Sequence, residues 1–321
     1  MRSITHRFFA LVATLVVGSI LSLGSAQYDP TEEVNFTIAF GPGGGNDIMS
    51  RNLVEILQKY DLYPGNVVAT NREGGSGAVG WGYLFNQRGS DYDLSTTSGS
   101  FITTPLQADT PWNAEDFVPI ALLATDDLVL LVNGDSEIDS FEEWLEVARS
   151  ETLAIGGIGA VNVDFIVPRV LSTVAGFEFD YVSFNAAGEL NTALLSGALD
   201  TIVSNPGEVI GLIDSGDMKA LAYSGRQTPD ALGDVPTFGD AGYDIGISMP
   251  RGLIMAPGAS VEAQQWWIET MKQVVETPEW QAYLDNNMLT EDVRYGDAFF
   301  DFLLNVRDNF ETILREEGAI D

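Results

Sequence analysis

The feature that most constrains this chain is a repeated order of segments: an apolar strand-like run, a loop of small residues, then a helix-like run. In the first case VNFTIAF (34–40) precedes GPGGGND, and apolar residues then recur at helical spacing up to Tyr60. Three more loops lie in the same order: NREGGSGAVG (71–80), GGIGAVN (156–162) and FNAAGEL (184–190). This alternation predicts parallel sheets with helices on their faces.

The alternation restarts once, which predicts two α/β units. LVLLVN (128–133) is typical of a buried strand, and RGLIMAPG (251–258) is a second apolar strand that can cross back. Two crossing strands would split the first unit and leave the second continuous. We therefore predict domain 1 from residues 27–128 plus 254–321 and domain 2 from 129–253. This is the layout of a hinged binding protein whose cleft closes on its ligand.

Three helical segments are expected at the end of the chain. Ser260 is a suitable cap for the first, and Thr277-Pro278-Glu279 opens the second with proline at the first helical position. The third carries apolar residues at helical spacing from Phe299 to Phe310.

The first 26 residues are expected to be a secretory signal peptide. Arg2, His6 and Arg7 form a basic start, residues 8–24 are apolar, and small residues lead to a cleavage site after Ala26. A transmembrane anchor is the alternative, because the apolar run is close to the minimum for a span, about 17 residues. Without cysteine there is no lipid-attachment site or disulfide. We expect a periplasmic product with no direct membrane insertion after cleavage.

The chain is strongly acidic. Its formal charge is -32, and loss of Arg2 and Arg7 with the leader makes it -34. Such a surface repels nucleic acid and anionic membranes, so neither is expected as a partner. The acidity indicates either adaptation to a salty environment, where self-repulsion is screened, or a cationic ligand.

The residue types present exclude several chemistries. The single histidine, His6, lies in the leader, and there is no cysteine, so the mature chain lacks a Ser-His-Asp or Cys-His nucleophile and a zinc site of the usual kind. No EF-hand spacing occurs. Paired carboxylates remain open for acid-base chemistry, but 47 acidic residues make any one pair uninformative. No cofactor and no metal site are predicted.

The glycine loops favour an anion site. A loop between a parallel strand and a helix presents free backbone N–H groups at the positive end of the helix dipole, where anions bind. Loops at the carboxyl ends of strands also face the ligand crevice of an open α/β sheet. The alternatives are that the glycines only permit tight turns, or that they form a nucleotide-binding loop. The second fits poorly, because no clean G-x-G-x-x-G with a downstream acid is present.

Several motifs resemble one known family. FGPGGGND (40–47), Asn71-Arg72 with Gly74 and Gly77, EDFVPI (115–120), DVPTF (234–238) with DAG (240–242), and Arg251-Gly252 before Ala256-Pro257 occur in the family's order. The chain is similar over nearly its whole mature length to the extracytoplasmic receptors of tripartite tricarboxylate transporters, also called the Bug family or TctC-like receptors.

The resemblance implies a fold, a function and a set of site residues. The fold is a type II periplasmic binding protein: two doubly wound α/β domains joined by two crossing strands. The function is capture of a small organic acid, a di- or tricarboxylate or an aromatic acid, and its delivery to membrane permease subunits by a monomeric, non-enzymatic receptor. The ligand-binding residues carried over by position are Gly43, Gly44, Gly45, Asn46, Asp47, Gly157, Ile158, Gly159, Ala160, Asn185, Ala186, Gly188 and Asp200.

The chain also departs from the family pattern. Asn46 stands where Ser or Thr is usual, and Ile158 and Ala160 stand where hydroxyl-bearing residues are common, so we expect greater reliance on backbone and water. Asp47 is a ligand contact or only a helix cap. Arg72 and Arg251 either pair with surface acids or grip a second carboxylate. Two other functions stay open: a periplasmic sensor of a carboxylate, and a carboxylate-dependent α/β enzyme.

Overall fold

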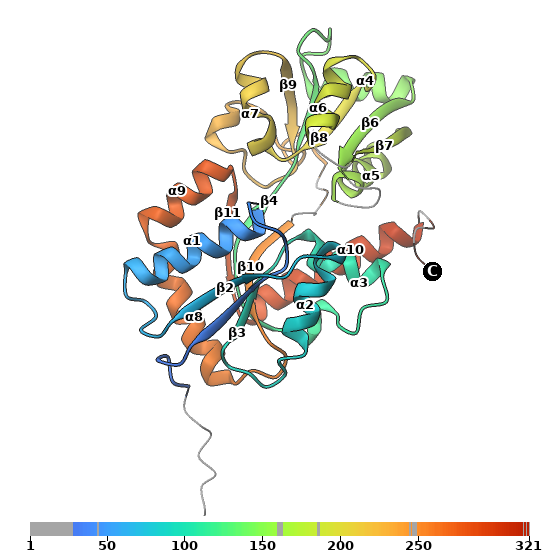
Figure 1. The fold of residues 1–321 in the computed structure, drawn as a ribbon. Coiled ribbons are helices and arrows are strands. Elements are labelled where there is room, and N and C mark those ends of the chain that lie inside the picture. Colours follow the sequence, from blue (N-terminus) through green and yellow to red (C-terminus); the bar gives the residue numbers. More distant parts are fainter. Residues whose placement is uncertain are drawn as a thin grey trace, which may run out of the picture.

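The computed structural model describes residues 28–43, 45–158, 163–184, 187–243, 245, 249–316, 318 and 320, with the side chain of Ile158 left out. The predicted signal peptide lies outside the described residues. No helix in the described part is long and apolar enough to cross a membrane. Figure 1 shows two lobes, each built around one sheet.

The first sheet has six strands in the order β11-β4-β10-β3-β1-β2. Its strands β1, β2 and β3 are parallel, β10 is antiparallel to both β3 and β4, and β11 is antiparallel to β4. The strand bounds are β1 (Val34–Ile38), β2 (Val67–Asn71), β3 (Asp93–Thr96), β4 (Val118–Asp126), β10 (Met249–Met255) and β11 (Thr290–Tyr295).

The second sheet has five strands in the order β7-β6-β8-β5-β9. Its strands β6, β7 and β8 are parallel, and β5 is antiparallel to both β8 and β9. The strand bounds are β5 (Val129–Asn133), β6 (Leu153–Ile158), β7 (Phe179–Phe184), β8 (Thr201–Ser204) and β9 (Met218–Tyr223).

The two sheets repeat one topology. In each, three parallel strands are followed by an antiparallel strand and then a fifth strand: β2-β1-β3-β10-β4 and β7-β6-β8-β5-β9. The two antiparallel strands, β5 and β10, coincide with the two apolar runs, so their prediction as strands is confirmed; β5 lies wholly in the second sheet and β10 wholly in the first. The topological repeat has no visible counterpart in the residues themselves.

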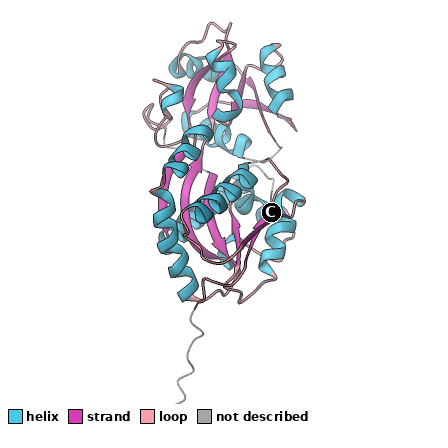
Figure 2. Ribbon diagram, turned by 60° about the vertical axis from the view of Figure 1, so that its left-hand side comes forward, coloured by secondary structure: helices cyan, strands magenta, loops and turns pink. Residues whose placement is uncertain are grey.

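Helices cover both faces of each sheet (Figure 2), as the predicted doubly wound class requires. The first lobe has α1 (Gly45–Lys59), α8 (Val261–Val275) and α9 (Pro278–Asn287) on one face, and α2 (Ala78–Phe85), α3 (Gly99–Gln107) and α10 (Asp297–Glu316) on the other. The second lobe has α4 (Phe141–Ser150) and α5 (Val163–Ala175) opposite α6 (Ala187–Leu195) and α7 (Pro206–Asp214). Short 3₁₀ turns are η1 (Gly75–Gly77), η2 (Ala114–Asp116) and η3 (Asp230–Leu232).

The predicted helix caps are present. Ser260 Oγ accepts a 3.1 Å hydrogen bond from the Ala263 N–H, and Thr277 Oγ1 accepts one of 3.3 Å from the Trp280 N–H. Each cap fixes the first turn of a helix that packs a buried tryptophan, Trp267 in α8 and Trp280 in α9, against the first sheet.

Three elements were not predicted from the sequence, and one boundary differs from expectation. Strand β4 continues from the EDFVPI motif, β11 is a polar edge strand, and α3 follows β3. The predicted domain boundary between residues 253 and 254 falls inside β10, which lies wholly in the first sheet. We therefore propose that the second junction precedes Met249.

Candidate functional site

The small-residue loops lie at matching edges of the two sheets. Because β1, β2 and β3 are parallel, their carboxyl ends meet at one edge, where α1, η1 and α3 begin. The ends of β6, β7 and β8 meet at one edge of the second sheet in the same way. A Cβ on Gly99, the first residue of α3, would lie 3.0 Å from Val163 Cγ2, at the start of α5. The helix starts of the two lobes therefore face each other.

Asp47 holds the first glycine loop in place. Its Oδ2 accepts a 2.9 Å hydrogen bond from the Gly43 N–H, and its Oδ1 accepts hydrogen bonds of 2.8 Å from Asn71 Nδ2 and 2.9 Å from Arg51 Nε. Burial alone would raise the pKa of Asp47, but these donors outweigh it and hold the pKa below its usual value. The carboxylate therefore organises the loop around a helix start rather than offering a free group to a ligand.

Asn46 is oriented by the end of β3. The side chain is 3% exposed, and its Oδ1 accepts a hydrogen bond from Thr96 Oγ1. Ser50 Oγ lies 3.0 Å from the same hydroxyl and donates to the Asn46 carbonyl at 2.8 Å. Asn46 Nδ2 has no partner among the residues that the structure describes. A buried amide N–H without an acceptor is rare, so this donor marks a place for an oxygen atom.

The second glycine loop has a structural role. Residues 74–77 all have positive φ, including Ser76, and Gly77 adjoins the buried ring of Trp81. The guanidinium of Arg72 stacks on the ring of Tyr83 in the same lobe, with its Cζ 3.6 Å from the ring centroid. For this loop the tight-turn alternative is the better description of the glycines.

Arg251 lies against the first glycine loop. A Cβ on Gly45 would lie 2.7 Å from Arg251 Nη2, so the guanidinium packs on the first residue of α1. The same Nη2 donates to the carboxylate of Asp126 at the end of β4, and the side chain of Arg251 is 13% exposed. Burial lowers the pKa of Arg251, but Asp126 reverses this effect and leaves the pKa raised.

The Asp126 carboxylate also bonds to the second lobe. Its Oδ1 accepts a 2.6 Å hydrogen bond from Asn205 Nδ2, and Asn205 is the N-cap of α7 at the end of β8. Gly45, Arg251, Asp126 and Asn205 thus form a continuous series of contacts from the first glycine loop to the second lobe. Gly45 was a predicted site residue and Arg251 was considered for a second carboxylate, but Asp126 and Asn205 were not predicted; their available signals were the Asp126-Asp127 pair after an apolar run and the Asn205-Pro206 helix start.

The second-lobe loop is described only in part. Gly157 is buried near the end of β6, where a Cβ would lie 2.6 Å from both Tyr181 Oη and Asp164 Cβ. Burial, and then the nearby Asp164 carboxylate, raise the pKa of Tyr181. Asp164 is 4% exposed in the first turn of α5 and was missed from sequence, although it occupies a position like that of Asp47 in α1.

The remaining predicted residues divide into three groups. Ile158 ends β6, and Gly188 is exposed in the first turn of α6, near the same edge. Asp200 precedes β8 and pairs with Ala154, whose N–H donates to its Oδ2 at 2.8 Å, so the structure does not bring it to the edge where β6 ends. Four or more strand residues separate the two positions, about 13 Å. Outside the described residues lie Gly44, Gly159, Ala160, Asn185 and Ala186.

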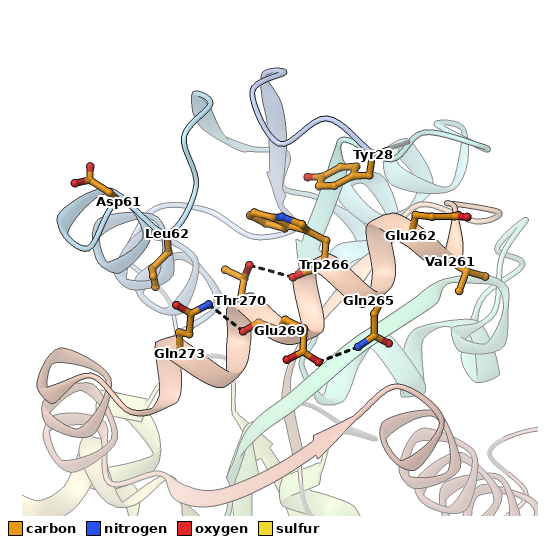
Figure 3. A pocket seen from close by; sticks show the side chains of 10 residues that line it. All are labelled: Tyr28, Asp61, Leu62, Val261, Glu262, Gln265, Trp266, Glu269, Thr270 and Gln273. Carbon is orange, nitrogen blue, oxygen red and sulfur yellow. Dashed lines mark hydrogen bonds between the residues drawn. The ribbon is translucent and has the colours of Figure 1, made fainter. Parts of the chain in front are cut away.

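A groove of about 630 Å³ lies elsewhere, beside α8 (Figure 3). Tyr28, Leu62 and Trp266 line it, and none of the predicted site residues does. Gln265 Nε2 donates to Glu269 Oε1 at 2.9 Å within this groove. The carboxylates of Asp61, Glu262 and Glu269 around it disfavour an anion, so we do not assign carboxylate binding to it.

No group of three Asp, Glu, His or Cys side chains within the described residues is arranged to hold a metal ion. The described donors at the facing edges are an amide, a guanidinium and helix N–H groups. Such donors suit an anionic oxygen ligand.

Known proteins share this fold. A TctC solute-binding protein from Polaromonas, solved with no ligand, has a TM-score of 0.81 at 24% identity and covers 89% of this chain and 99% of its own. MatC from Rhodopseudomonas palustris with bound malate has a TM-score of 0.68 at 16% identity, covering 89% and 100%. An R. palustris protein with adipate has a TM-score of 0.72 at 19% identity, covering 90% and 98%.

Sequence comparison identifies the family. Protein BugT of Bordetella pertussis is 25% identical over 260 residues, which are 78% of each chain. The family described as "Tripartite tricarboxylate transporter family receptor" matches residues 51–300, well over half of the chain. With the motifs, the two repeated sheets and the facing loops, this match shows that the chain belongs to the tripartite tricarboxylate transporter receptor family.

Proposed function

We propose that this protein is a periplasmic receptor that binds a small organic carboxylate between its lobes and delivers it to a tripartite tricarboxylate-type permease. The observation that carries the proposal is the unpartnered Nδ2 of Asn46, 97% buried at the start of α1. A carboxylate oxygen placed there would accept a hydrogen bond from Nδ2. It would also lie at the positive end of the dipole of a 15-residue helix. The malate and adipate bound by two structural neighbours support the same ligand class.

The proposed ligand contacts come from both lobes. The first lobe contributes Gly43 to Asp47, mainly through backbone N–H groups and Asn46. The second contributes Gly157 to Ala160, together with Asn185, Ala186 and Gly188. Asp200 is left out, because its carboxylate accepts a bond from the Ala154 N–H at the far end of β6. Closure of the lobes would exclude water and strengthen these contacts.

The remaining parts of the proposal follow from the leader and the missing nucleophiles. We infer cleavage after Ala26, a monomeric periplasmic product without cofactor, and stoichiometric binding without turnover. A periplasmic sensor that docks on a membrane kinase uses the same binding step. An enzyme instead predicts turnover that falls when one Asp at the facing edges becomes Asn.

A ligand screen tests the proposal. The protein, purified from the periplasm in high salt, is screened by thermal shift against mono-, di- and tricarboxylates, aromatic acids, amino acids and cationic osmolytes. A ligand at 100 times its Kd adds about 2.7 kcal/mol of stability, which gives a clear rise in Tm. A rise limited to carboxylates supports the receptor. A response only to cations or zwitterions contradicts it.

A further inference from the structure

Several buried polar atoms at one edge of the first sheet have no partner among the described residues. They include Asn46 Nδ2, Ser98 Oγ and Arg251 Nε, from the segments that follow β1 and β3 and from β10, and also Arg72 Nε after β2, whose guanidinium lies over the ring of Tyr83. The proposed carboxylate site uses the first of them. Ser98 Oγ and Arg251 Nε require a separate explanation, because buried donors in folded proteins nearly always have an acceptor.

The end of β3 brings Asn46, Ser98 and Arg251 together. Thr96 donates to Asn46 Oδ1, and Thr97 bonds to both neighbours of Arg251. The Thr97 N–H donates to the Gly252 carbonyl at 2.9 Å, and the Gly252 N–H donates to Thr97 Oγ1 at 2.9 Å. Ser98, next along the chain, therefore lies beside the segment that carries Arg251.

Both Ser98 and Arg251 keep a hydrogen-bonding group that no described contact within the protein satisfies. Ser98 is the N-cap residue of α3, but its Oγ accepts no hydrogen bond from the first turn of that helix. Arg251 uses Nη2 for Asp126, and Asp126 is itself held by Asn205, so the guanidinium has a fixed orientation with Nε left over. A fixed guanidinium with a free donor is suited to a carboxylate.

The electrostatics of this place favour a second negative charge. The guanidinium of Arg251 packs on the first residue of α1, and Ser98 precedes the first turn of α3, so two helix N-termini flank a buried cation. Asp126 offsets the charge of the arginine, and Glu208 of α7, whose pKa is raised by burial and then by the nearby Asp126, is a further carboxyl group close to this pair. An apolar ligand tail here would leave both remaining donors unpaired.

We propose that Ser98 and Arg251 form a subsite for a second carboxylate, so that the receptor selects short dicarboxylates over monocarboxylates of the same chain length. The proposal rests on the proposed function, since the first carboxylate is placed at Asn46. The spacing is short, because Gly45 contacts the guanidinium of Arg251 and is followed directly by Asn46. Asp126 and Asn205 act as positioning residues.

Calorimetry with matched ligands tests this subsite. The periplasmic protein is titrated with succinate against butyrate and with adipate against hexanoate. We expect the dicarboxylate of at least one pair to bind about tenfold or more tightly than its partner, as charged hydrogen bonds provide. S98A and R251M should each reduce this preference, measured as the ratio of the two Kd values, at least several-fold. R294M, which breaks the Arg294–Asp292 pair on β11, is the control and should keep the preference.

R251M leaves Asp126 buried without its cation and could unfold for that reason alone. The double variant R251M/D126N removes the unpaired charge, and S98A leaves the Arg251–Asp126 pair intact, so both are also titrated. An unchanged preference in folded S98A and in the double variant overturns the subsite. Equal binding of both members of every pair by the wild-type protein also overturns it and leaves the receptor function standing. If no carboxylate binds, both proposals fail.

Discussion

Asp47 Oδ1 lies 2.8 Å from Asn71 Nδ2, and this hydrogen bond joins the first turn of α1 to the last residue of β2. Arg51 bonds to both partners, with Nε on Asp47 and Nη2 on Asn71 Oδ1 at 2.8 Å. The first glycine loop is therefore fixed by a closed network. A preorganised loop binds an anion without first losing conformational entropy.

Replacing Asp47 by Asn should damage both stability and binding. The new amide places a donor among the donors of Gly43, Asn71 and Arg51, so we expect a loss of about 1–3 kcal/mol in the free energy of unfolding. Ligand affinity should fall about tenfold through the disordered loop. Urea denaturation and calorimetry measure the two effects. D240N, which alters an exposed carboxylate that accepts from Thr237, is the control; equal effects of both changes would contradict the network.

Gly77 should tolerate no side chain. It has φ of 88°, and a Cβ would lie 2.1 Å from Trp81 Cζ3. We expect G77A to lower the free energy of unfolding by about 2–4 kcal/mol. G89A changes a glycine with φ of 78° and nothing within 4 Å, and should cost about 1 kcal/mol. Urea denaturation of the two variants separates the clash from the backbone strain, and equal losses would show that the Trp81 contact is unimportant.

Acid should weaken the hydrogen bonds that join the end of α1 to Glu279 in α9. Hydrogen bonds from Lys59 and Tyr60 lower the pKa of Glu279 to about 2 from 4.5. Because the folded value is the lower one, the carboxylate stabilises the protein above pH 4.5, and this contribution disappears as the pH falls toward 2. E279Q should therefore show a smaller drop in Tm between about pH 5 and pH 3 than the wild type.

Removing the two donors to Glu279 gives the control for this change. In a K59M/Y60F background both hydrogen bonds to the carboxylate are lost, and E279Q should then alter the pH dependence of Tm little. The same difference between Glu and Gln in both backgrounds would assign the acid effect to other carboxylates.

Salt should speed the binding of a dicarboxylate. The formal charge is -32, or -34 once the predicted leader is removed; either charge repels an anion at long range, and the screening length falls from about 10 Å at 0.1 M to about 3 Å at 1 M salt. Contacts inside the closed site should change less. Stopped-flow fluorescence measures the on-rate directly, and an on-rate that falls with added salt would favour a cationic ligand.

Much of the architecture follows from local patterns. The alternation of apolar runs and small-residue loops predicts the parallel strands and the helix starts, because each signal lies within a few residues. The elements that were missed give misleading local signals. Helix α3 contains Pro105 and the β-branched run Ile102 to Thr104, and β11 is a polar edge strand. Only packing against the rest of the lobe determines these segments.

The candidate site likewise has residues that local sequence signals indicate and residues that only the tertiary structure brings together. Glycines after strands point to the anion loops, and Asn46 is visible as a departure from the family pattern. The partnership of Arg251 with Asp126 joins residues 125 positions apart, so it depends on the antiparallel pairing of β10 with β4. The placement of Asp200 depends on register in the same way, because β8 starts beside the middle of β6.

The most direct test is calorimetric titration of small dicarboxylates into the wild-type protein and its N46D variant. The account predicts one ligand per wild-type chain. It also predicts at least about 100-fold weaker binding by N46D, because a carboxylate would replace the Asn46 donor and repel the ligand. N46D that binds as tightly as the wild type, or a wild-type protein that binds no carboxylate, would contradict the account.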